Sequence, residues 1–203
     1  LVAHDVKALH LPFAPVDDTM IAAYLIEPGR SAYLIDDLAA EYGLELQPEP
    51  PAEETTALLV RHAEAGESSS GDPDLSPAGE KRVASLGGLI DDVLVDRKVD
   101  YLYAADTRRS QQTAAPVANE FKLPINVIAS SDWSGLAARI KREHRGKTVV
   151  VVGYSTTLPG VISQLSGSDY VMRDDEFDAI YVVVMPSPGE TRVLRLRYGQ
   201  PTP

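Results

Sequence analysis

The sequence predicts an α/β fold: a three-layer α/β/α domain with a mostly parallel sheet over residues 55–199, plus a short helical N-terminal segment. Strand-like segments rich in valine and leucine alternate with amphipathic helical segments, the order typical of a parallel sheet with helices on both faces. Polar residues follow the ends of three predicted strands, where α/β proteins bind their ligands. We therefore expect one site at the carboxyl edge of the sheet.

Residues 1–46 predict two short helices. The first lies within DDTMIAAYLIE, where Asp18 precedes apolar residues at near-helical spacing. The second is SAYLIDDLAAEYG, with Ser31 as its N-cap and Gly43 as its C-cap. Residues 47–54 (QPEPPAEE) are rich in proline and glutamate and have no core pattern, so we expect a linker there.

The main domain alternates short apolar runs with helical periodicity. TTALLV at 55–60 predicts the first strand, and residues 75–96 predict one amphipathic helix with Ser76 as N-cap and Pro77 in its first turn. Further strands are predicted at 100–105, 124–129, 148–153, 179–185 and 191–197, and helices at 108–122, 134–146 and 157–167. The last two strands are expected to form an antiparallel hairpin around PSPGE.

The composition excludes several classes of protein. The 203 residues contain no cysteine, which excludes disulfides, thiolate nucleophiles and zinc–thiolate sites, and which favours a reducing, cytoplasmic compartment. The net charge of −11 argues against binding to nucleic acid or to an anionic membrane. No apolar run approaches the ~20 residues that a membrane helix needs. We expect no metal and no other cofactor, and the start at Leu1 suggests a trimmed N-terminus.

Three predicted strand ends carry the candidate site residues. Arg61 and His62 follow the first strand, Arg109 follows the second near the start of a helix, and Tyr154 and Ser155 follow the buried strand TVVVVG. These strand ends are expected to converge on one pocket. Ser155 is predicted to open the next helix, whose backbone N–H groups would favour an anion.

Four segments in order carry a resemblance to a known family: LLVRHAEAG, DPDLSPAGEKRV, YAADTRRSQQTAAPVA and TVVVVGYSTTLP. They resemble the histidine phosphatase superfamily, and most closely its SixA-like and phosphoglycerate mutase-like members, over residues 55–199. The resemblance implies a metal-independent phosphatase in which His62 is the nucleophile and becomes a phosphohistidine. It also implies that Arg61 and Arg109 clamp the phosphate, since guanidinium groups stay charged and bind two oxygens each.

The sequence departs from this family at Tyr154. The family carries a second catalytic histidine there, in a Gly-His-Ser pattern, whereas tyrosine can donate one O–H bond but supplies no charge below a pKa of ~10. Three interpretations remain open: a slow phosphatase, a module that binds a phosphorylated small molecule or phosphoprotein without turnover, and a laboratory substitution. The sequence leaves the oligomeric state open.

A leaving group needs a proton, and three acidic residues are candidates for the general acid. Glu64 lies two residues after the nucleophile, and Asp132 and Glu176 lie near other predicted strand ends. For each of them, a plain solvated surface position is the competing interpretation.

Residues 1–46 carry a second resemblance. The motifs His4-Asp5-Val6-Lys7 and Asp18-Thr19-Met20 resemble a fragment of the 3′–5′ exonuclease-type domain of bacterial DNA polymerase I. Two-metal nuclease chemistry needs several convergent carboxylates, and the acidic Asp-x-Glu and Tyr-x-x-x-Asp motifs of that family are missing. We therefore expect no nuclease activity from this segment.

Overall fold

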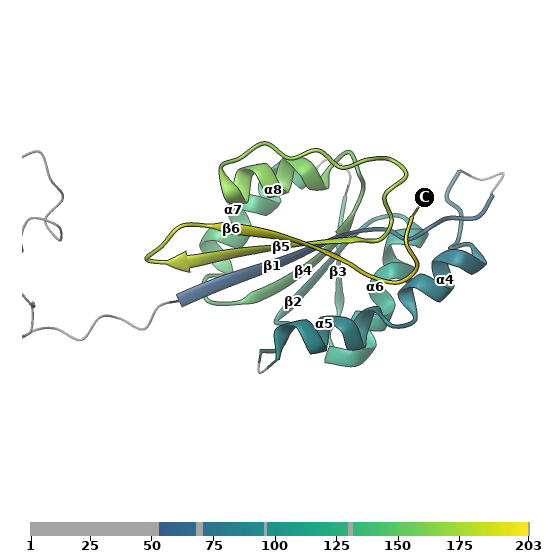
Figure 1. Ribbon diagram of the computed structural model, residues 1–203, viewed down its shortest axis with the longest axis horizontal. Coiled ribbons are helices and arrows are strands. Elements are labelled where there is room, and N and C mark those ends of the chain that lie inside the picture. Colours follow the sequence, from purple (N-terminus) through teal and green to yellow (C-terminus); the bar gives the residue numbers. More distant parts are fainter. Residues whose placement is uncertain (1–52, 68–70, 96, 130–131, 203) are drawn as a thin grey trace, which may run out of the picture. The chain divides into compact units, whose positions relative to one another are not determined.

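Six strands form one mixed sheet in the order β3-β2-β4-β1-β5-β6 (Figure 1). The structure is a computed structural model that describes residues 53–67, 71–95, 97–129 and 132–202. The strands are β1 (Glu53–Arg61), β2 (Tyr101–Ala105), β3 (Ile125–Ile128), β4 (Thr148–Gly153), β5 (Ala179–Ser187) and β6 (Arg192–Arg197). The first four run parallel, β5 is antiparallel to β1, and β6 is antiparallel to β5. The predicted mostly parallel sheet and its late antiparallel hairpin are confirmed.

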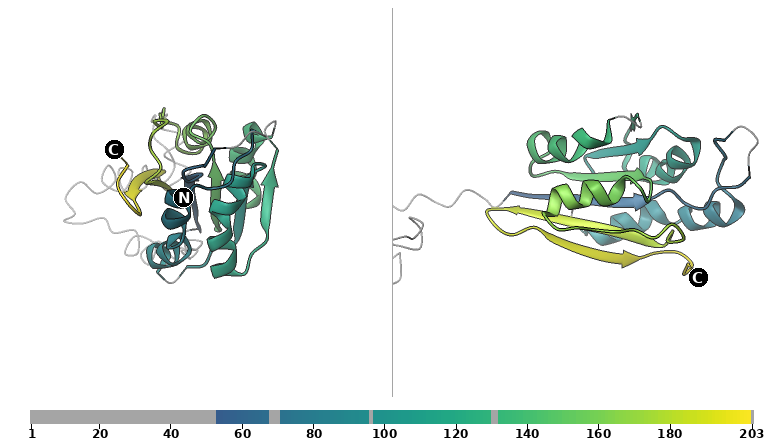
Figure 2. Two further views of the ribbon diagram at one scale, coloured as in Figure 1. Left: turned by 90° about the vertical axis from the view of Figure 1, so that its right-hand side faces the viewer. Right: turned by 90° about the horizontal axis from the view of Figure 1, so that it is seen from above.

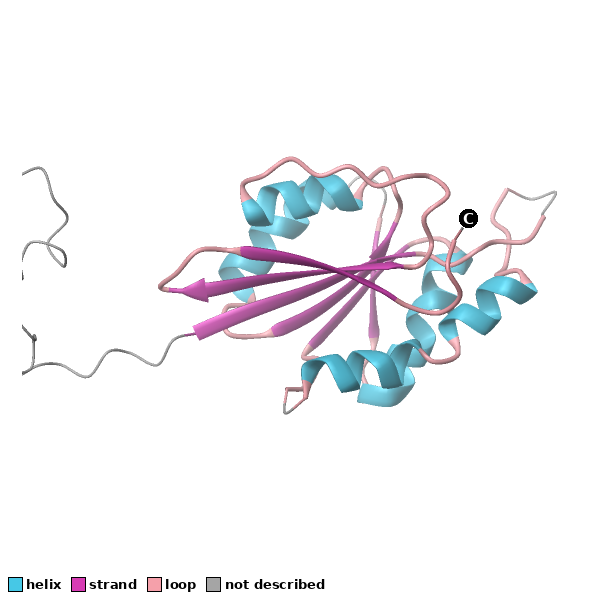
Figure 3. Ribbon diagram, viewed as in Figure 1, coloured by secondary structure: helices cyan, strands magenta, loops and turns pink. Residues whose placement is uncertain are grey.

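Helices cover both faces of this sheet, as Figures 2 and 3 show. They are α4 (Pro77–Val83), α5 (Leu86–Leu94), α6 (Arg108–Phe121), α7 (Trp133–Glu143) and α8 (Leu158–Ser166). The apolar residues of α5 and α6 pack on one face, and those of α7 and α8 pack on the other. Within the described part of the chain, no helix is long and apolar enough to cross a membrane.

The central strands β1 and β4 are buried on both faces, which explains their continuous apolar sequences. Leu58 and Val150 face the cluster beneath α5 and α6, whereas Leu59 and Val151 face the cluster beneath α7 and α8. All four side chains have no exposed surface. This sandwiched pair of strands gives the site a rigid base, because the candidate residues follow the carboxyl ends of these two strands.

The predicted helix at 75–96 is two helices rather than one. Helix α4 begins after the predicted N-cap Ser76, whose hydroxyl accepts a hydrogen bond from the Gly79 amide, and α5 starts anew at Leu86. The two helices pack on different partners: Val83 of α4 packs over the loop after β1, whereas α5 packs on the sheet and on α6. A single straight helix could pack against only one of these partners. The helix therefore breaks between Val83 and Leu86, although the apolar periodicity of the sequence continues through this segment.

The N-terminal predictions lie mostly outside the described residues. This applies to the helices within residues 1–46, to the likeness to an exonuclease fragment and to residues 47–52 of the predicted linker. Strand β1 begins at Glu53, so the last two residues of that predicted linker belong to the sheet instead.

Candidate active site

The candidate site lies where three loops leave the carboxyl ends of β1, β4 and β2. Arg61 is in register with Gly153, and the His62 amide donates a hydrogen bond to the Gly153 carbonyl at 2.9 Å. Strand β2 pairs with β4 on its other side, and α6 begins three residues after β2 ends. The predicted convergence of these strand ends therefore follows from the parallel register of the sheet.

His62 is buried and its ring is held in one orientation. Its Nδ1 lies 2.9 Å from the carbonyl oxygen of Ala63, which can only accept a hydrogen bond, so Nδ1 carries the proton. The other nitrogen, Nε2, then presents a lone pair, and Arg109 donates its Nε–H to that lone pair at 3.3 Å. The backbone carbonyl thus selects the tautomer that leaves Nε2 nucleophilic.

The surroundings of His62 keep the imidazole neutral. Burial lowers the pKa of His62 to about 4 and outweighs the opposite effect of the Ala63 carbonyl. The value of about 4 also includes the effect of the positive charges of Arg109 and Arg61, which lower the pKa in the same direction as burial. A neutral imidazole is the form that can attack an electrophile, and this imidazole stays neutral at physiological pH.

The backbone of Arg109 is held at the start of α6 by the side chain of Thr113. The Thr113 hydroxyl donates to the Arg109 carbonyl at 2.7 Å and accepts from the Ala63 amide at 3.0 Å. Thr113 has no exposed surface. One buried hydroxyl thus connects the loop of His62 to the helix turn that carries Arg109, and it sets the distance between them.

Arg61 is also buried, and part of its guanidinium has no partner. Its Nη1 donates to the backbone carbonyls of Asp174 and, at 3.4 Å each, of Arg173 and Glu176. The guanidinium carbon lies 3.9 Å from the centre of the Phe177 ring. The Nε atom is buried without a hydrogen-bond partner. Buried donors are nearly always paired, but four other described side chains also have such an atom, so the Nε atom of Arg61 does not by itself identify a ligand.

Tyr154 lies beside His62, but its hydroxyl points to a different loop. The two rings meet edge-on with centroids 5.8 Å apart, and the Arg109 guanidinium carbon lies 5.5 Å from the Tyr154 ring centre. The hydroxyl donates toward Thr107 at 3.2 Å and Asp106 at 3.3 Å, and burial raises its pKa. Tyr154 therefore offers the site a ring face, with its one donor committed elsewhere.

Ser155 does not open a helix as predicted. Helix α8 begins at Leu158 after Thr157, and Ser155 lies in the turn before it. The Ser155 hydroxyl donates to the Asp174 carboxylate at 2.7 Å. The predicted phosphate contact through Ser155 would require this hydroxyl to exchange its partner.

Comparisons with known proteins found a family model and solved structures that resemble this chain. Residues 57–132 match the family model of the Histidine phosphatase superfamily (branch 1). The resemblance to histidine phosphatases is confirmed. None of the curated proteins matches the chain significantly.

Several solved structures share the fold of this chain. The protein histidine phosphatase SixA complexed with tungstate is 17% identical, with a TM-score of 0.57 over 70% of this chain and 96% of that chain. A putative phosphohistidine phosphatase SixA from Nakamurella multipartitia is 18% identical, with a TM-score of 0.52 over 74% and 100%. A putative alpha-ribazole-5′-P phosphatase from Escherichia coli is 16% identical, with a TM-score of 0.51 over 70% and 96%. At these identities the likeness shows a common fold.

The carboxylate of Glu64 is bound by a structural partner, Arg82. Its carboxylate receives hydrogen bonds from Arg82 Nε at 3.0 and 2.9 Å and from Arg82 Nη2 at 2.6 Å. Burial raises the pKa of Glu64, but the bonds from Arg82 outweigh burial and hold that pKa below its ordinary value. A group that holds its charge so firmly is a poor proton donor, so the geometry argues against the predicted role of Glu64 as the acid.

The other two acid candidates are also placed away from that role. Glu176 is buried and forms an ion pair with Arg195, while its backbone carbonyl faces Arg61. Asp132 is exposed and stands at the start of α7. Neither has a hydrogen bond to His62 among the interactions of the described residues.

Two residues near the site were missed by reasoning from the sequence. Asp72 lies 3.5 Å from Arg109 Nη1, and Phe177 stacks on Arg61 and lies with its ring centre 6.2 Å from that of His62. Asp72 begins the segment DPDLSPAGEKRV, but that resemblance gave it no role, and Phe177 comes from a loop without motif, so only the tertiary structure brings both to the site.

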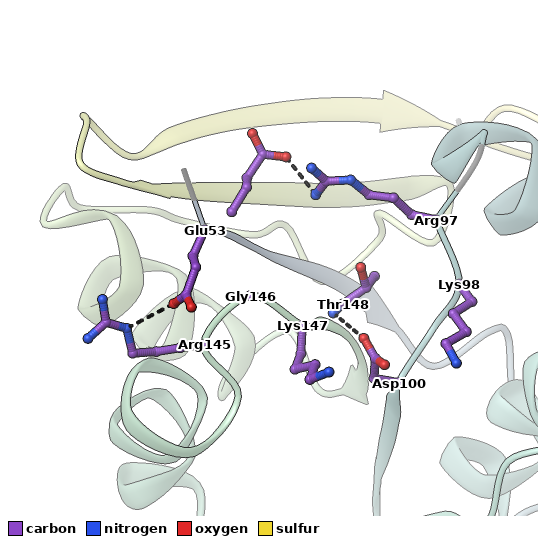
Figure 4. A pocket seen from close by; sticks show the side chains of 9 residues that line it. Glu53, Arg97, Lys98, Asp100, Arg145, Gly146, Lys147 and Thr148 are labelled. Atoms are coloured by element: carbon purple, nitrogen blue, oxygen red, sulfur yellow. Dashed lines mark hydrogen bonds and ion pairs between the residues drawn. The ribbon is translucent and has the colours of Figure 1, made fainter. Parts of the chain in front are cut away.

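A second hollow lies at the opposite, amino end of the strands. It measures about 600 Å³ and is lined by Glu53, Glu54, Arg97, Lys98, Asp100, Arg145, Gly146, Lys147 and Thr148 (Figure 4). Its arginines are paired within the chain: Arg97 with Glu54 at 2.7 Å and Arg145 with Glu53 at 3.8 Å. None of the residues that line this hollow is a histidine. Among the described residues, no group of three or more His, Cys, Asp or Glu side chains is arranged to hold a metal.

Proposed function

We propose that this domain hydrolyses phosphomonoesters through a phosphohistidine at His62, and that Tyr154 makes the reaction slow. The observation that carries the proposal is the buried, neutral His62 ring, with its tautomer set by Ala63 and its Nε2 facing Arg109. The family match and the shared fold support the same chemistry.

In the first step, the phosphate of the substrate replaces His62 Nε2 as the partner of Arg109. The lone pair of Nε2 is then released to attack phosphorus, the N–P bond forms, and the bond from phosphorus to the leaving oxygen breaks. The transferring group carries negative charge on its three outer oxygens. Arg109 and the guanidinium of Arg61 supply donors and positive charge for these oxygens.

In the second step, water attacks the phosphorus of phospho-His62. The N–P bond breaks, the water loses a proton to solvent or product, and inorganic phosphate leaves with the imidazole restored. Since Glu64 is committed to Arg82, the proton for the first leaving group comes from solvent. The reaction is then fastest for leaving groups that are stable as anions.

The slow rate is proposed to arise from the lost donor at Tyr154. Its hydroxyl is bound toward Asp106 and Thr107, so the transition state has one donor and one positive charge fewer than with a histidine. Removal of one such donor costs on the order of 10²–10³ in rate.

The same observation favours a second candidate function. A site that retains both arginines but lacks the last donor can bind a phosphorylated small molecule or phosphoprotein without turnover. Similar folds include a protein histidine phosphatase and a putative alpha-ribazole-5′-P phosphatase, which suggests that the fold accommodates both kinds of partner.

Hydrolysis of p-nitrophenyl phosphate distinguishes the two functions, because its leaving group needs no acid. The hydrolase proposal predicts slow turnover by the unmodified chain, loss of turnover in His62→Ala, and faster turnover in Tyr154→His. If the unmodified chain does not hydrolyse p-nitrophenyl phosphate but Tyr154→His does, the binding module is favoured. If neither protein hydrolyses it, the proposed site is contradicted.

A further inference from the structure

We propose that the site discriminates against substrates whose leaving group carries a second negative charge, and that Asp72 is the main residue responsible. This inference rests on the proposed phosphate site and adds a property of the group attached to the phosphate. It comes from two carboxylates that the structure holds beside the two arginines, those of Asp72 and Asp174.

Asp72 is fixed in place although it lies on a loop. Its two carboxylate oxygens accept from the backbone amide of Arg108 at 3.1 and 3.2 Å, and Oδ1 lies 3.5 Å from Nη1 of Arg109. The side chain of Asp72 is still 39% exposed. A carboxylate that is fixed in position and exposed to solvent can repel or attract a charged ligand without a change of conformation.

The loop around Asp72 is fastened to the first turns of α6. The Asp74 carboxylate accepts from Gln112 Nε2 at 2.7 Å, and the Leu75 amide donates to Gln112 Oε1 at 2.9 Å. Arg108 adds an ion pair to Asp74 at 2.8 Å. The charge of Asp74 is therefore balanced by Arg108. The cation beside Asp72 is Arg109, which also belongs to the proposed phosphate site.

Asp174 stands beside the other arginine of the clamp. Its carboxylate accepts from the Ser155 hydroxyl at 2.7 Å, and its backbone carbonyl accepts from Arg61 Nη1. Asp174 is exposed to solvent. Each arginine of the proposed clamp thus has an exposed carboxylate from a different loop next to it.

These positions determine what a substrate meets beyond its phosphate. The rings of Tyr154 and Phe177 flank His62 with centroids 5.8 and 6.2 Å from its own, so the attached group extends toward the exposed side, where Asp72 and Asp174 lie. A like charge about 6 Å away in a largely solvated setting weakens binding roughly three- to tenfold. Salt screens such an effect, so the discrimination should shrink as ionic strength rises.

Three phosphonates that resist hydrolysis test this inference by calorimetric titration: phenylphosphonate, its 4-carboxy derivative and its 4-aminomethyl derivative. For the unmodified chain at low salt, we expect the carboxylated compound to bind most weakly. The ratio of its Kd to that of phenylphosphonate should fall roughly three- to tenfold in Asp72→Asn, and further when Asp174→Asn is added.

Two control variants separate local charge from other effects. Asp72→Glu keeps the charge and should keep the ratio, and Asp92→Asn removes an exposed charge on α5 and should leave the ratio unchanged. The inference is overturned if all three phosphonates bind equally well, or if Asp92→Asn changes the ratio as much as Asp72→Asn. If none of the phosphonates binds, the proposed phosphate site itself fails, and this inference fails with it.

Discussion

At the scale of single residues, the neutral state of His62 is the property on which the proposed reaction depends. A histidine in water has a pKa of ~6.5 and is half charged near that pH. Burial and two arginines lower the pKa of His62 to about 4, so the lone pair of Nε2 is available well below pH 6. The same two arginines are the proposed phosphate clamp, so in this proposal one arrangement of charge serves both the nucleophile and the clamp.

This low pKa predicts the pH dependence of the reaction. The acidic limb of kcat/KM reports the ionisation of the free enzyme, so activity should persist on acidification and fall only as the pH approaches about 4. The ring carbon resonances of His62 in an NMR titration should report the same midpoint. If the acidic limb of kcat/KM or the midpoint of the NMR titration lay near pH 6.5, His62 would be solvated rather than buried.

The two neighbouring arginines of α6 should differ sharply in their effect on activity. Arg109→Ala removes a clamp group beside His62 and should lower kcat/KM by roughly 10²–10³. Arg108→Ala removes an exposed ion pair with Asp74, whose partners are 63% and 52% exposed, and should change kcat/KM little. Equal losses in the two variants, measured with p-nitrophenyl phosphate, would refute the assignment of Arg109 to the clamp.

At the scale of elements, the contact between α5 and α6 depends on a glycine. A Cβ atom added at Gly87 would lie 2.8 Å from the Pro116 carbonyl oxygen of α6, whereas one at Gly88 would meet nothing within 4 Å. The sequence GG within α5 therefore contains one glycine that the packing requires and one that it does not. Neither the periodicity nor the propensity of the segment distinguishes them.

This contrast predicts opposite effects of two adjacent substitutions. Gly88→Ala should raise the free energy of unfolding by about 0.5–1 kcal/mol, because alanine is the better helix former. Gly87→Ala should lower the free energy of unfolding by about 1–3 kcal/mol, because the added methyl overpacks the contact with α6. Urea unfolding of both variants checks the pair, and stabilisation by Gly87→Ala would mean that α5 does not lie so close to α6.

Elements and their order could be predicted from the sequence where one local pattern determines them. TVVVVG predicts β4 because a strand buried on both faces needs an unbroken apolar run, and Ser76-Pro77 predicts the start of α4 because capping is local. The break between α4 and α5 could not be predicted, since it depends on which distant surfaces the two helices contact. The ion pair of Glu64 could not be predicted either, because its partner Arg82 lies 18 residues away in the sequence.

At the scale of the whole molecule, the site residues on strand ends could be predicted and those on loops could not. The proximity of His62, Arg61 and Arg109 could be predicted because parallel strands bring their carboxyl ends to one edge, whereas their roles come from the family resemblance and stay a prediction. Asp72 and Phe177 reach the site only through the long-range contacts of their loops.

Buried histidine also makes the stability of the whole fold depend on pH. The pKa of His62 is lowered in the folded state, so between about pH 6.5 and 4 the unfolded chain binds more protons than the folded chain. The free energy of unfolding should therefore fall as the pH is lowered through that window, by on the order of 3 kcal/mol from His62. Burial lowers the pKa of His144 as well, which adds to the fall in the same direction. Unfolding of His62→Gln should show a smaller fall over this window, and an unchanged fall would contradict the burial of His62.

The central claim concerns where an oxyanion binds, and a crystal soaked with tungstate tests it most directly. The account predicts one tungstate within hydrogen-bond reach of His62 Nε2, Arg109 and the guanidinium of Arg61, with Arg109 shifted from the imidazole to the anion. Tungstate ordered in the hollow of Arg97, Lys98, Arg145 and Lys147, with none beside His62, would contradict it.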